Sequence, residues 1–111
     1  MSVLVFADNS DGTFKKTAFE IVSFGKEVAK QAETSLVVVT INADDVSSLS
    51  TYGPDKILKI QDSKLESFNA KAYADCIHQA ANKESADIIV VDSTNNGLYV
   101  APILAEKLDA G

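Results

Sequence analysis

Two short polar runs follow apolar stretches of the sequence, and their side chains could surround a ligand. Asp8, Asn9 and Ser10 follow the first stretch, and the run Asp-Ser-Thr-Asn at residues 92–95 follows the last. If each stretch is a strand of one parallel sheet, both runs lie at the edge where open α/β sheets bind their ligands. The candidate binding residues are Asp8, Asn9, Ser93, Thr94 and Gly97.

An anion is the first ligand to consider at this edge. A helix that begins near Gly97 would aim its free N–H groups at the ligand. Two features oppose a phosphate: the carboxylates of Asp8 and Asp92 would repel it, and the run is neither a Walker A motif nor a complete G-x-G-x-x-G fingerprint. The same residue types are also the ordinary chemistry of turns and helix N-caps. Both interpretations stay open on the sequence alone.

A phosphate-accepting carboxylate is a second possible chemistry, because Asp8 and Asp62 each follow an apolar stretch. It requires an acidic cluster that holds Mg²⁺ and a lysine after a fifth strand, and the sequence places neither where it is needed. Cys76 and His78 do not match metal-ligand spacing, and no nucleophile, base and orienting group form a recognisable set. We therefore predict no catalytic residues and no metal site. We expect Cys76 in the core and His78 in solvent.

The strands that would position these residues are four apolar stretches, Val3–Ala7, Leu36–Ile41, Lys56–Ile60 and Asp87–Val91. The second and fourth contain the runs LVVVTI and DIIVV, which are continuous and rich in β-branched residues. Such runs are typical of strands that are buried on both faces of a parallel sheet.

Helical periodicity separates the strands. Apolar residues recur at helical spacing in residues 14–32, 67–82 and 97–108. Thr13 can cap the first of these helices. A shorter helix is expected over Asp44–Tyr52, where Gly53 suits a left-handed C-terminal position and Pro54 prevents continuation.

The alternation of strands and helices predicts a single α/β domain over residues 1–111. Right-handed crossovers give a doubly wound parallel sheet in a three-layer, Rossmann-like or adenine-nucleotide-hydrolase-like arrangement with strand order 3-2-1-4. We expect no fifth strand beyond the fourth, which would leave an exposed sheet edge capable of self-association.

Composition excludes several classes of protein. The chain has a net charge of −6 and ten basic residues, all of them lysine, which argues against binding to nucleic acid through its phosphates. No apolar run is long enough for a membrane span, and we expect neither direct membrane insertion nor a signal peptide ahead of the first strand. One cysteine excludes an internal disulfide and fits a cytoplasmic protein.

Three segments together resemble the electron transfer flavoprotein alpha subunit. The opening strand, loop and long helix of residues 1–31, the segment TYGPDKILKIQDSKLESFNAKAYADCI at 51–77, and ADIIVVDSTNNGLYVAPILAEKLDAG at 86–111 follow the family's order. In the last segment the matching positions are Gly97, Pro102, Ala105 and Leu108. The family's lysine and arginine in this segment are replaced by Leu98 and Ile103.

The resemblance implies a role in a larger assembly. In the family, an alpha subunit pairs with an electron transfer flavoprotein beta subunit, and the heterodimer carries FAD and accepts electrons from dehydrogenases. Most FAD contacts come from a C-terminal domain that these 111 residues do not include. We therefore expect an N-terminal structural and assembly domain that is not itself an enzyme and binds no FAD alone. The alternative is a stand-alone module for binding adenine nucleotides, similar to universal stress proteins.

Overall fold

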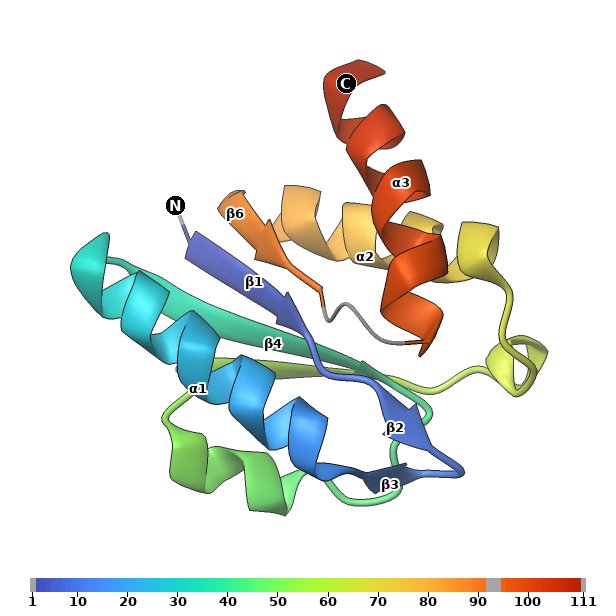
Figure 1. The fold of residues 1–111 in the computed structure, drawn as a ribbon, viewed down its shortest axis with the longest axis horizontal. Helices are drawn as coiled ribbons and strands as arrows, with labels where there is room; N and C mark the ends of the chain where they lie inside the picture. The colour runs from blue at the N-terminus through green and yellow to red at the C-terminus, as the bar shows by residue number, and fades with distance from the viewer. Residues whose placement is uncertain (1, 92–94, 111) are drawn as a thin grey trace.

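The computed structural model describes residues 2–91 and 95–110, and its centre is a four-stranded parallel sheet (Figure 1). The strands are β1 (Ser2–Phe6), β4 (Ser35–Ile41), β5 (Lys56–Ile60) and β6 (Ala86–Val90). They are ordered β5-β4-β1-β6, which confirms the predicted order 3-2-1-4 and the α/β fold class.

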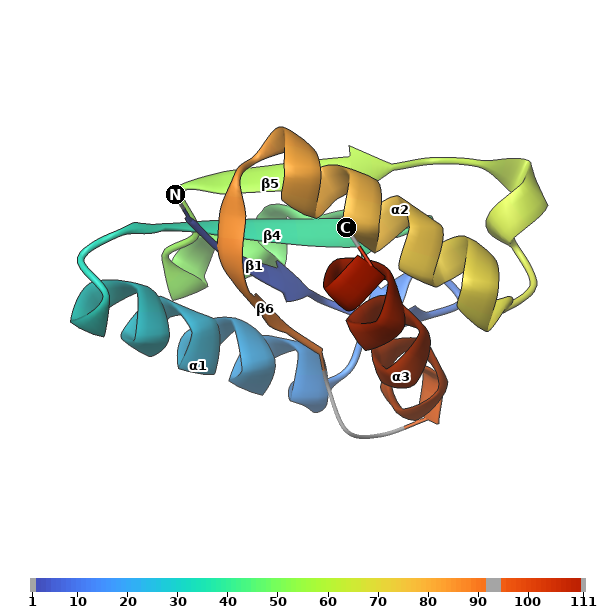
Figure 2. The ribbon, with the colours of Figure 1, turned by 90° about the horizontal axis from the view of Figure 1, so that it is seen from above.

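Helices cover both faces of the sheet. The helix α1 (Lys16–Gln31) and the 3₁₀ helix η1 (Ser47–Tyr52) lie on one side, and α2 (Ala70–Lys83) lies on the other (Figure 2). The last helix, α3 (Asn95–Ala110), packs against α2 and contributes Val100 and Leu104 to the same apolar cluster. No helix among the described residues is long and apolar enough to cross a membrane.

Side chains of the central strands alternate between two apolar clusters. In β1, Leu4 and Phe6 join the cluster under α2, whereas Val3 and Val5 join the cluster under α1. All four are at most 1% exposed, because β1 has a strand on each side and a helix on each face. This is the burial that a continuous apolar strand predicts.

The two continuous apolar runs differ in their burial. All residues of β4 from Leu36 to Ile41 are buried, as predicted. The prediction that DIIVV is buried on both faces is wrong: Asp87 and Ile88 are exposed and the rest of β6 is half-buried. The physical reason is position, since β6 is the last strand in the sheet order and pairs only with β1 among the described residues.

A small hairpin after β1 changes the start of α1. Residues Asn9–Ser10 (β2) and Thr13–Phe14 (β3) pair in antiparallel fashion around Asp11 and Gly12, both of which have positive φ. Two central residues with positive φ are the requirement of a tight hairpin turn. Because Thr13 lies in β3, the prediction that it caps a helix from Phe14 is wrong, and α1 begins at Lys16.

The other helix boundaries shift by a few residues. The start of α2 is Ala70 rather than residue 67, because Asn69 Oδ1 accepts a hydrogen bond from the Ala72 N–H at 3.0 Å. The short helix expected from Asp44 is the 3₁₀ helix η1, and Gly53 ends it in the predicted left-handed conformation with φ of 85°. At the end of β5, the 3₁₀ helix η2 (Ser63–Leu65) leads toward α2.

Candidate functional site

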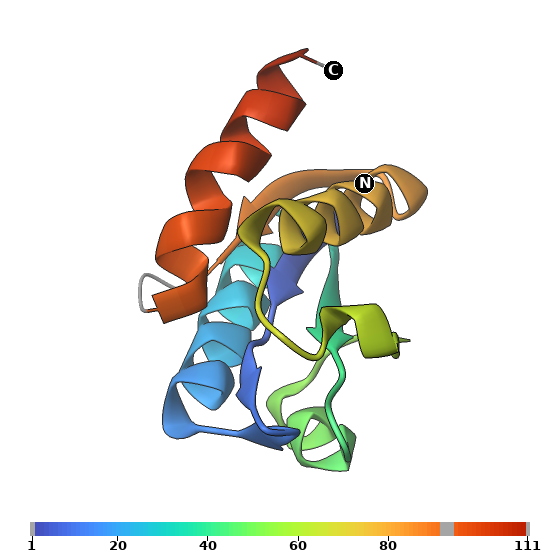
Figure 3. The same cartoon turned by 90° about the vertical axis from the view of Figure 1, so that its right-hand side faces the viewer.

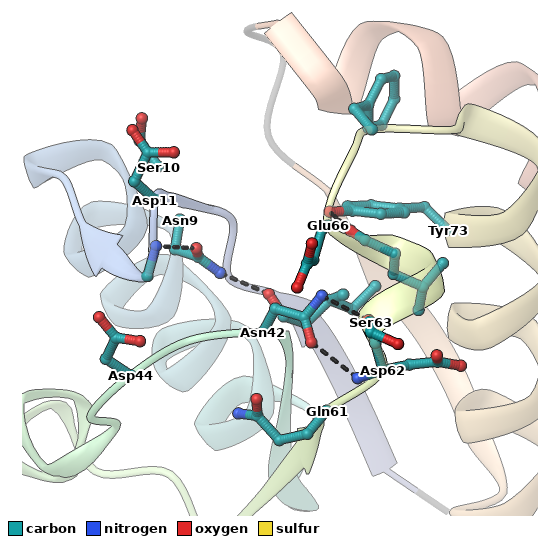
Figure 4. A pocket seen from close by; sticks show the side chains of 14 residues that line it. Asn9, Ser10, Asp11, Asn42, Asp44, Gln61, Asp62, Ser63, Glu66 and Tyr73 are labelled. Atoms are coloured by element: carbon teal, nitrogen blue, oxygen red, sulfur yellow. Dashed lines mark hydrogen bonds between the residues drawn. The ribbon is translucent and has the colours of Figure 1, made fainter.

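A cleft of about 830 Å³ opens at the carboxyl ends of β1, β4 and β5. Figure 3 faces this end of the molecule, around which the β2–β3 hairpin and η2 are arranged. Figure 4 shows the lining: Ser10 and Asp11 come from the hairpin, Asn42 and Asp44 from the loop after β4, and Asp62, Ser63 and Glu66 from the loop after β5. This edge is where an open parallel sheet normally binds a ligand.

Asn9 connects the hairpin to the sheet. Its Nδ2 donates to the Ile41 carbonyl at 2.7 Å, and its Oδ1 accepts from the Gly12 N–H at 2.9 Å. The Gly12 carbonyl in turn accepts from the Asp44 N–H at 2.9 Å. An amide suits this position because it provides a donor and an acceptor at once. Both groups of the Asn9 amide are therefore engaged within the protein.

Asn42 makes a second connection, between the loops after β4 and β5. Its Oδ1 accepts from the Asp62 N–H at 2.8 Å and its Nδ2 donates to the Asp62 carbonyl at 2.9 Å. Its backbone has φ of 55°, a left-handed conformation that asparagine tolerates better than most residues. The amide thus extends the pairing of β4 and β5 beyond the last residues of the strands.

Carboxylates dominate the electrostatics of the cleft. Four of them, Asp11, Asp44, Asp62 and Glu66, belong to its lining. The ammonium of Lys59 donates to the Asp44 carbonyl at 3.2 Å and is therefore held outside, beside the backbone. A lining of this charge repels an anion and favours a cation.

Tyr73 forms an apolar wall of the same cleft. Its hydroxyl donates to the Leu65 carbonyl at 3.3 Å, and its ring meets Phe6 and Phe68 edge to face at centroid distances of 5.9 and 5.0 Å. Burial first, and then the charge of Asp8, raise the pKa of the Tyr73 hydroxyl above its ordinary value of 10.0. The hydroxyl therefore stays protonated near neutral pH and serves as a donor, not as a base.

The predicted binding residues do not all come together in this cleft. Asn9 lines it, and Asp8 stands just before Asn9, whose N–H donates to Asp8 Oδ1 at 2.9 Å. Ser93 and Thr94 lie outside the described residues. Gly97 is the third residue of α3, which begins at Asn95 instead of residue 97. The predicted ligand site between β1 and β6 therefore stays a prediction.

Other reactive side chains remain apart. Among residues 2–91 and 95–110, no three histidine, cysteine or acidic side chains form a group able to hold a metal ion. Cys76, expected in the core, is half-buried; burial first, and then Asp62 and Asp75, raise the pKa of its thiol above the ordinary 9.0. His78, expected in solvent, is half-buried as well.

Sequence reasoning missed two features of the cleft. The dipeptide Asp11-Gly12 is a strong hairpin signal that could have revealed the β2–β3 wall. The role of Asn42 had no such signal, because its partner Asp62 is twenty residues away and reaches it only through the register of β4 and β5.

Comparison with known proteins gives a consistent result. A family model described as the electron transfer flavoprotein domain matches residues 3–111. The chain is 30% identical over 112 residues to the electron transfer flavoprotein subunit alpha of Clostridium acetobutylicum, covering 98% of this chain and 33% of that protein. It is 27% identical over 110 residues to the subunit of the same name from Bacillus subtilis, covering 98% of this chain and 34% of that protein.

A third relative has a different name. The acryloyl-CoA reductase electron transfer subunit beta of Anaerotignum propionicum is 26% identical over 112 residues, which are 98% of this chain and 30% of that protein. The chain thus spans about a third of the length of the curated relatives that it matches.

Proposed function

The chain belongs to the electron transfer flavoprotein domain family, and we propose that it acts as the structural and assembly domain of an alpha-type subunit. In this role it supports a flavoprotein that carries electrons, while the flavin chemistry takes place elsewhere in the assembly. The domain contributes shape, docking surfaces and stability, and no side chain of its own reacts with substrate.

The acidic cleft is the observation that carries this proposal. The edge at which an α/β sheet would hold a nucleotide is bridged by Asn9 and Asn42 and lined by Asp11, Asp44, Asp62 and Glu66. A pyrophosphate needs backbone N–H groups, arginine or lysine at close range. The chain has no arginine and the lining of this cleft includes no lysine, so the lining does not suit the pyrophosphate of FAD.

FAD is therefore proposed for the intact heterodimer and not for this chain alone. The proposed partners are an electron transfer flavoprotein beta subunit and, through the whole complex, dehydrogenases that deliver electrons; the proposed location is the cytoplasm. Neither nucleic acid nor the membrane is a proposed partner of the domain. The sequence also predicts self-association through the exposed sheet edge, and this stays a prediction.

Two measurements on the purified chain test the proposal. We expect a colourless protein without visible flavin absorbance, and no saturable heat when FAD or AMP is titrated to millimolar concentration in a calorimeter. A flavin spectrum after purification, or saturable binding of FAD, would contradict the assembly role. Saturable binding of AMP without flavin would instead support the stand-alone nucleotide-binding module.

Assembly itself is tested by mixing. We expect the chain to co-elute with an electron transfer flavoprotein beta subunit on size exclusion in the absence of FAD, because a structural domain does not need the cofactor to dock. Separate elution of the two proteins at micromolar concentration would oppose the proposal.

A further inference from the structure

The acidic cleft at the carboxyl ends of β1, β4 and β5 contains carboxylates that the domain itself does not pair. Within the described part of the chain, the side chains of Asp11, Asp44 and Glu66 have no ion-pair or hydrogen-bond partner. Asp62 differs, because its Oδ1 accepts from the Lys64 N–H at 2.9 Å and so caps η2. The described lining therefore offers three carboxylates to an occupant.

These carboxylates stand on two different walls of the cleft. Asp44 lies against the β2–β3 hairpin: its N–H donates to the Gly12 carbonyl at 2.9 Å, and its carboxylate packs so closely on Gly12 that a β-carbon there would collide with it. Asp11 belongs to the same hairpin. Figure 4 shows Glu66 extending into the cleft from the loop after β5. A ligand that neutralises both walls therefore spans the cleft.

An aromatic ring follows Glu66 on the same wall. Phe68 lines the cleft and is 38% exposed. Tyr73 meets this ring edge to face at a centroid distance of 5.0 Å, and the Tyr73 hydroxyl is itself tied to the Leu65 carbonyl. Aromatic faces attract cations. Arginine combines stacking on a ring with forked hydrogen bonding to a carboxylate, so it suits this wall better than lysine.

The size of the cleft and the spread of its charges limit the occupant. Among residues 2–91 and 95–110, no three acidic side chains form a group able to hold a metal ion. The volume of about 830 Å³ lies within the range of roughly 300–1,000 Å³ that ligand sites have. These 111 residues contain no arginine, so a second copy of the domain cannot supply a guanidinium.

We propose that the acidic cleft binds an arginine-bearing segment of another polypeptide. One guanidinium pairs with Glu66 over the ring of Phe68, and a second pairs with Asp11 and Asp44 on the hairpin wall. The carboxylates supply an attraction that salt weakens, and the ring selects arginine over lysine. This inference rests on the proposed assembly role and names the chemistry by which a partner docks.

A synthetic peptide tests this directly. The probe is the capped peptide Gly-Arg-Gly-Ser-Arg-Gly, titrated at low salt into the isotope-labelled chain and followed by NMR. We expect saturable shifts of the backbone amide signals of Gly12 and Glu66, and no change at Ala29, near the end of α1 that lies away from the cleft (Figure 1). No saturable shift at the cleft up to millimolar peptide, or equal shifts at Ala29, would overturn the proposal.

Two further probes identify the cation that is recognised. The same peptide with lysine in place of both arginines, and the aliphatic polyamine spermidine, should each bind at least about fivefold more weakly. In Phe68→Leu the preference for arginine over lysine should largely disappear. Equal affinity for either further probe in the natural chain would mean that charge alone is recognised and would overturn the proposal. An undiminished preference in Phe68→Leu would contradict the role of the ring.

Matched charge variants separate the cleft from the net charge of the chain. The double variant D44N/E66Q keeps the shapes of two side chains that make no hydrogen bonds, and it should weaken binding of the arginine peptide by about tenfold or more. The control E27Q/E106Q removes the same charge from exposed residues outside the cleft and should retain affinity within about twofold. Equal weakening by the two double variants would show general attraction and overturn the proposal.

Failure of this inference is distinguishable from failure of the assembly role. The peptide titration needs no beta subunit, and co-elution with a beta subunit needs no peptide. A chain that co-elutes with a beta subunit but binds no arginine peptide would overturn the inference and leave the assembly role supported. Tight binding of the arginine peptide at the cleft, lost in D44N/E66Q and kept in E27Q/E106Q, is the result that we expect.

Discussion

Asn42 and Asp62 hold the loops after β4 and β5 together through two reciprocal hydrogen bonds, at 2.8 and 2.9 Å. The Asn42 amide here takes the place of a peptide group and continues the parallel ladder for one more step. The backbone N–H of Asn42 adds to this, since it donates to the Ile60 carbonyl at 2.7 Å. The Asn42 side chain therefore helps to position the segment that carries Asp62, Ser63 and Glu66, together with this backbone bond and the bond from the Tyr73 hydroxyl to the Leu65 carbonyl.

The first prediction concerns Asn42→Ala. It removes both side-chain hydrogen bonds and leaves a β-carbon in a left-handed conformation without the local bonding that favours asparagine there. We expect the free energy of unfolding to fall by about 2–3 kcal/mol, measured by urea denaturation. Asn42→Gly tolerates the left-handed backbone conformation and loses only the two side-chain hydrogen bonds. Its free energy of unfolding should therefore fall by about 1–2 kcal/mol. Equal losses in the two variants would mean that backbone strain contributes nothing.

How far the sequence predicts the fold depends on whether a feature is local. The burial of Val38 and Val39 follows from a continuous β-branched run, and Gly53 ends η1 where a Gly-Pro pair indicates it. Phe14 misleads, because it has helical spacing with Ala18 and yet lies in β3, where its ring reaches the core and is only 9% exposed. Periodicity alone cannot distinguish a core residue of a helix from one placed just before it.

The site was less predictable for the same reason. Asn9 was identified as a polar group at the sheet edge, but its partners Gly12 and Ile41 depend on a hairpin and on the neighbouring strand. Asn42 acquires its function only when β4 and β5 are in register. The exposure of Ile88 follows from the place of β6 at the end of the predicted strand order, whereas its continuous apolar run alone predicts burial on both faces.

The second prediction concerns the contact of α1 with the sheet. A β-carbon at Gly25 would collide with Val5 Cγ2 and approach Leu36 Cδ1 to 3.2 Å. Alanine is favoured over glycine in a helix by roughly 1 kcal/mol, but overpacking a core costs about 1–3 kcal/mol. We expect Gly25→Ala to destabilise the protein by about 1–2 kcal/mol in urea denaturation. In a Val5→Ala background, Gly25→Ala should leave the free energy of unfolding unchanged or raise it. A higher free energy of unfolding for Gly25→Ala in the natural chain would contradict the close contact.

The third prediction concerns the pH dependence of the ion pair between Lys107 of α3 and Asp75 of α2. The hydrogen bond from Lys107 lowers the pKa of the Asp75 carboxyl below its ordinary value of 3.8. Because the folded-state pKa is the lower one, this stabilisation is fully present above 3.8 and is lost as the pH falls through the lowered value. We expect Asp75→Asn to reduce stability at neutral pH and the difference from the natural chain to shrink in strong acid. In a Lys107→Met background the substitution should have little effect at either pH; an undiminished effect there would assign it to another partner.

The fourth prediction concerns a buried hydroxyl in the central strand β4. Thr40 is 0% exposed, and its Oγ1 has no hydrogen-bond partner within the part of the chain that the structure describes. Leaving such a group unsatisfied costs about 1–3 kcal/mol, so Thr40→Val should raise the free energy of unfolding by about 1 kcal/mol. Ser2→Ala is the matched control, because Ser2 is also buried, at 2% exposed, but its hydroxyl donates to the Glu84 carbonyl at 2.9 Å. The free energy of unfolding of Ser2→Ala should fall by about 1 kcal/mol. In thermal or urea unfolding, Thr40→Val should be more stable than the natural chain and Ser2→Ala less stable. A loss of stability in Thr40→Val would mean that the Thr40 hydroxyl has a hydrogen-bond partner in solution.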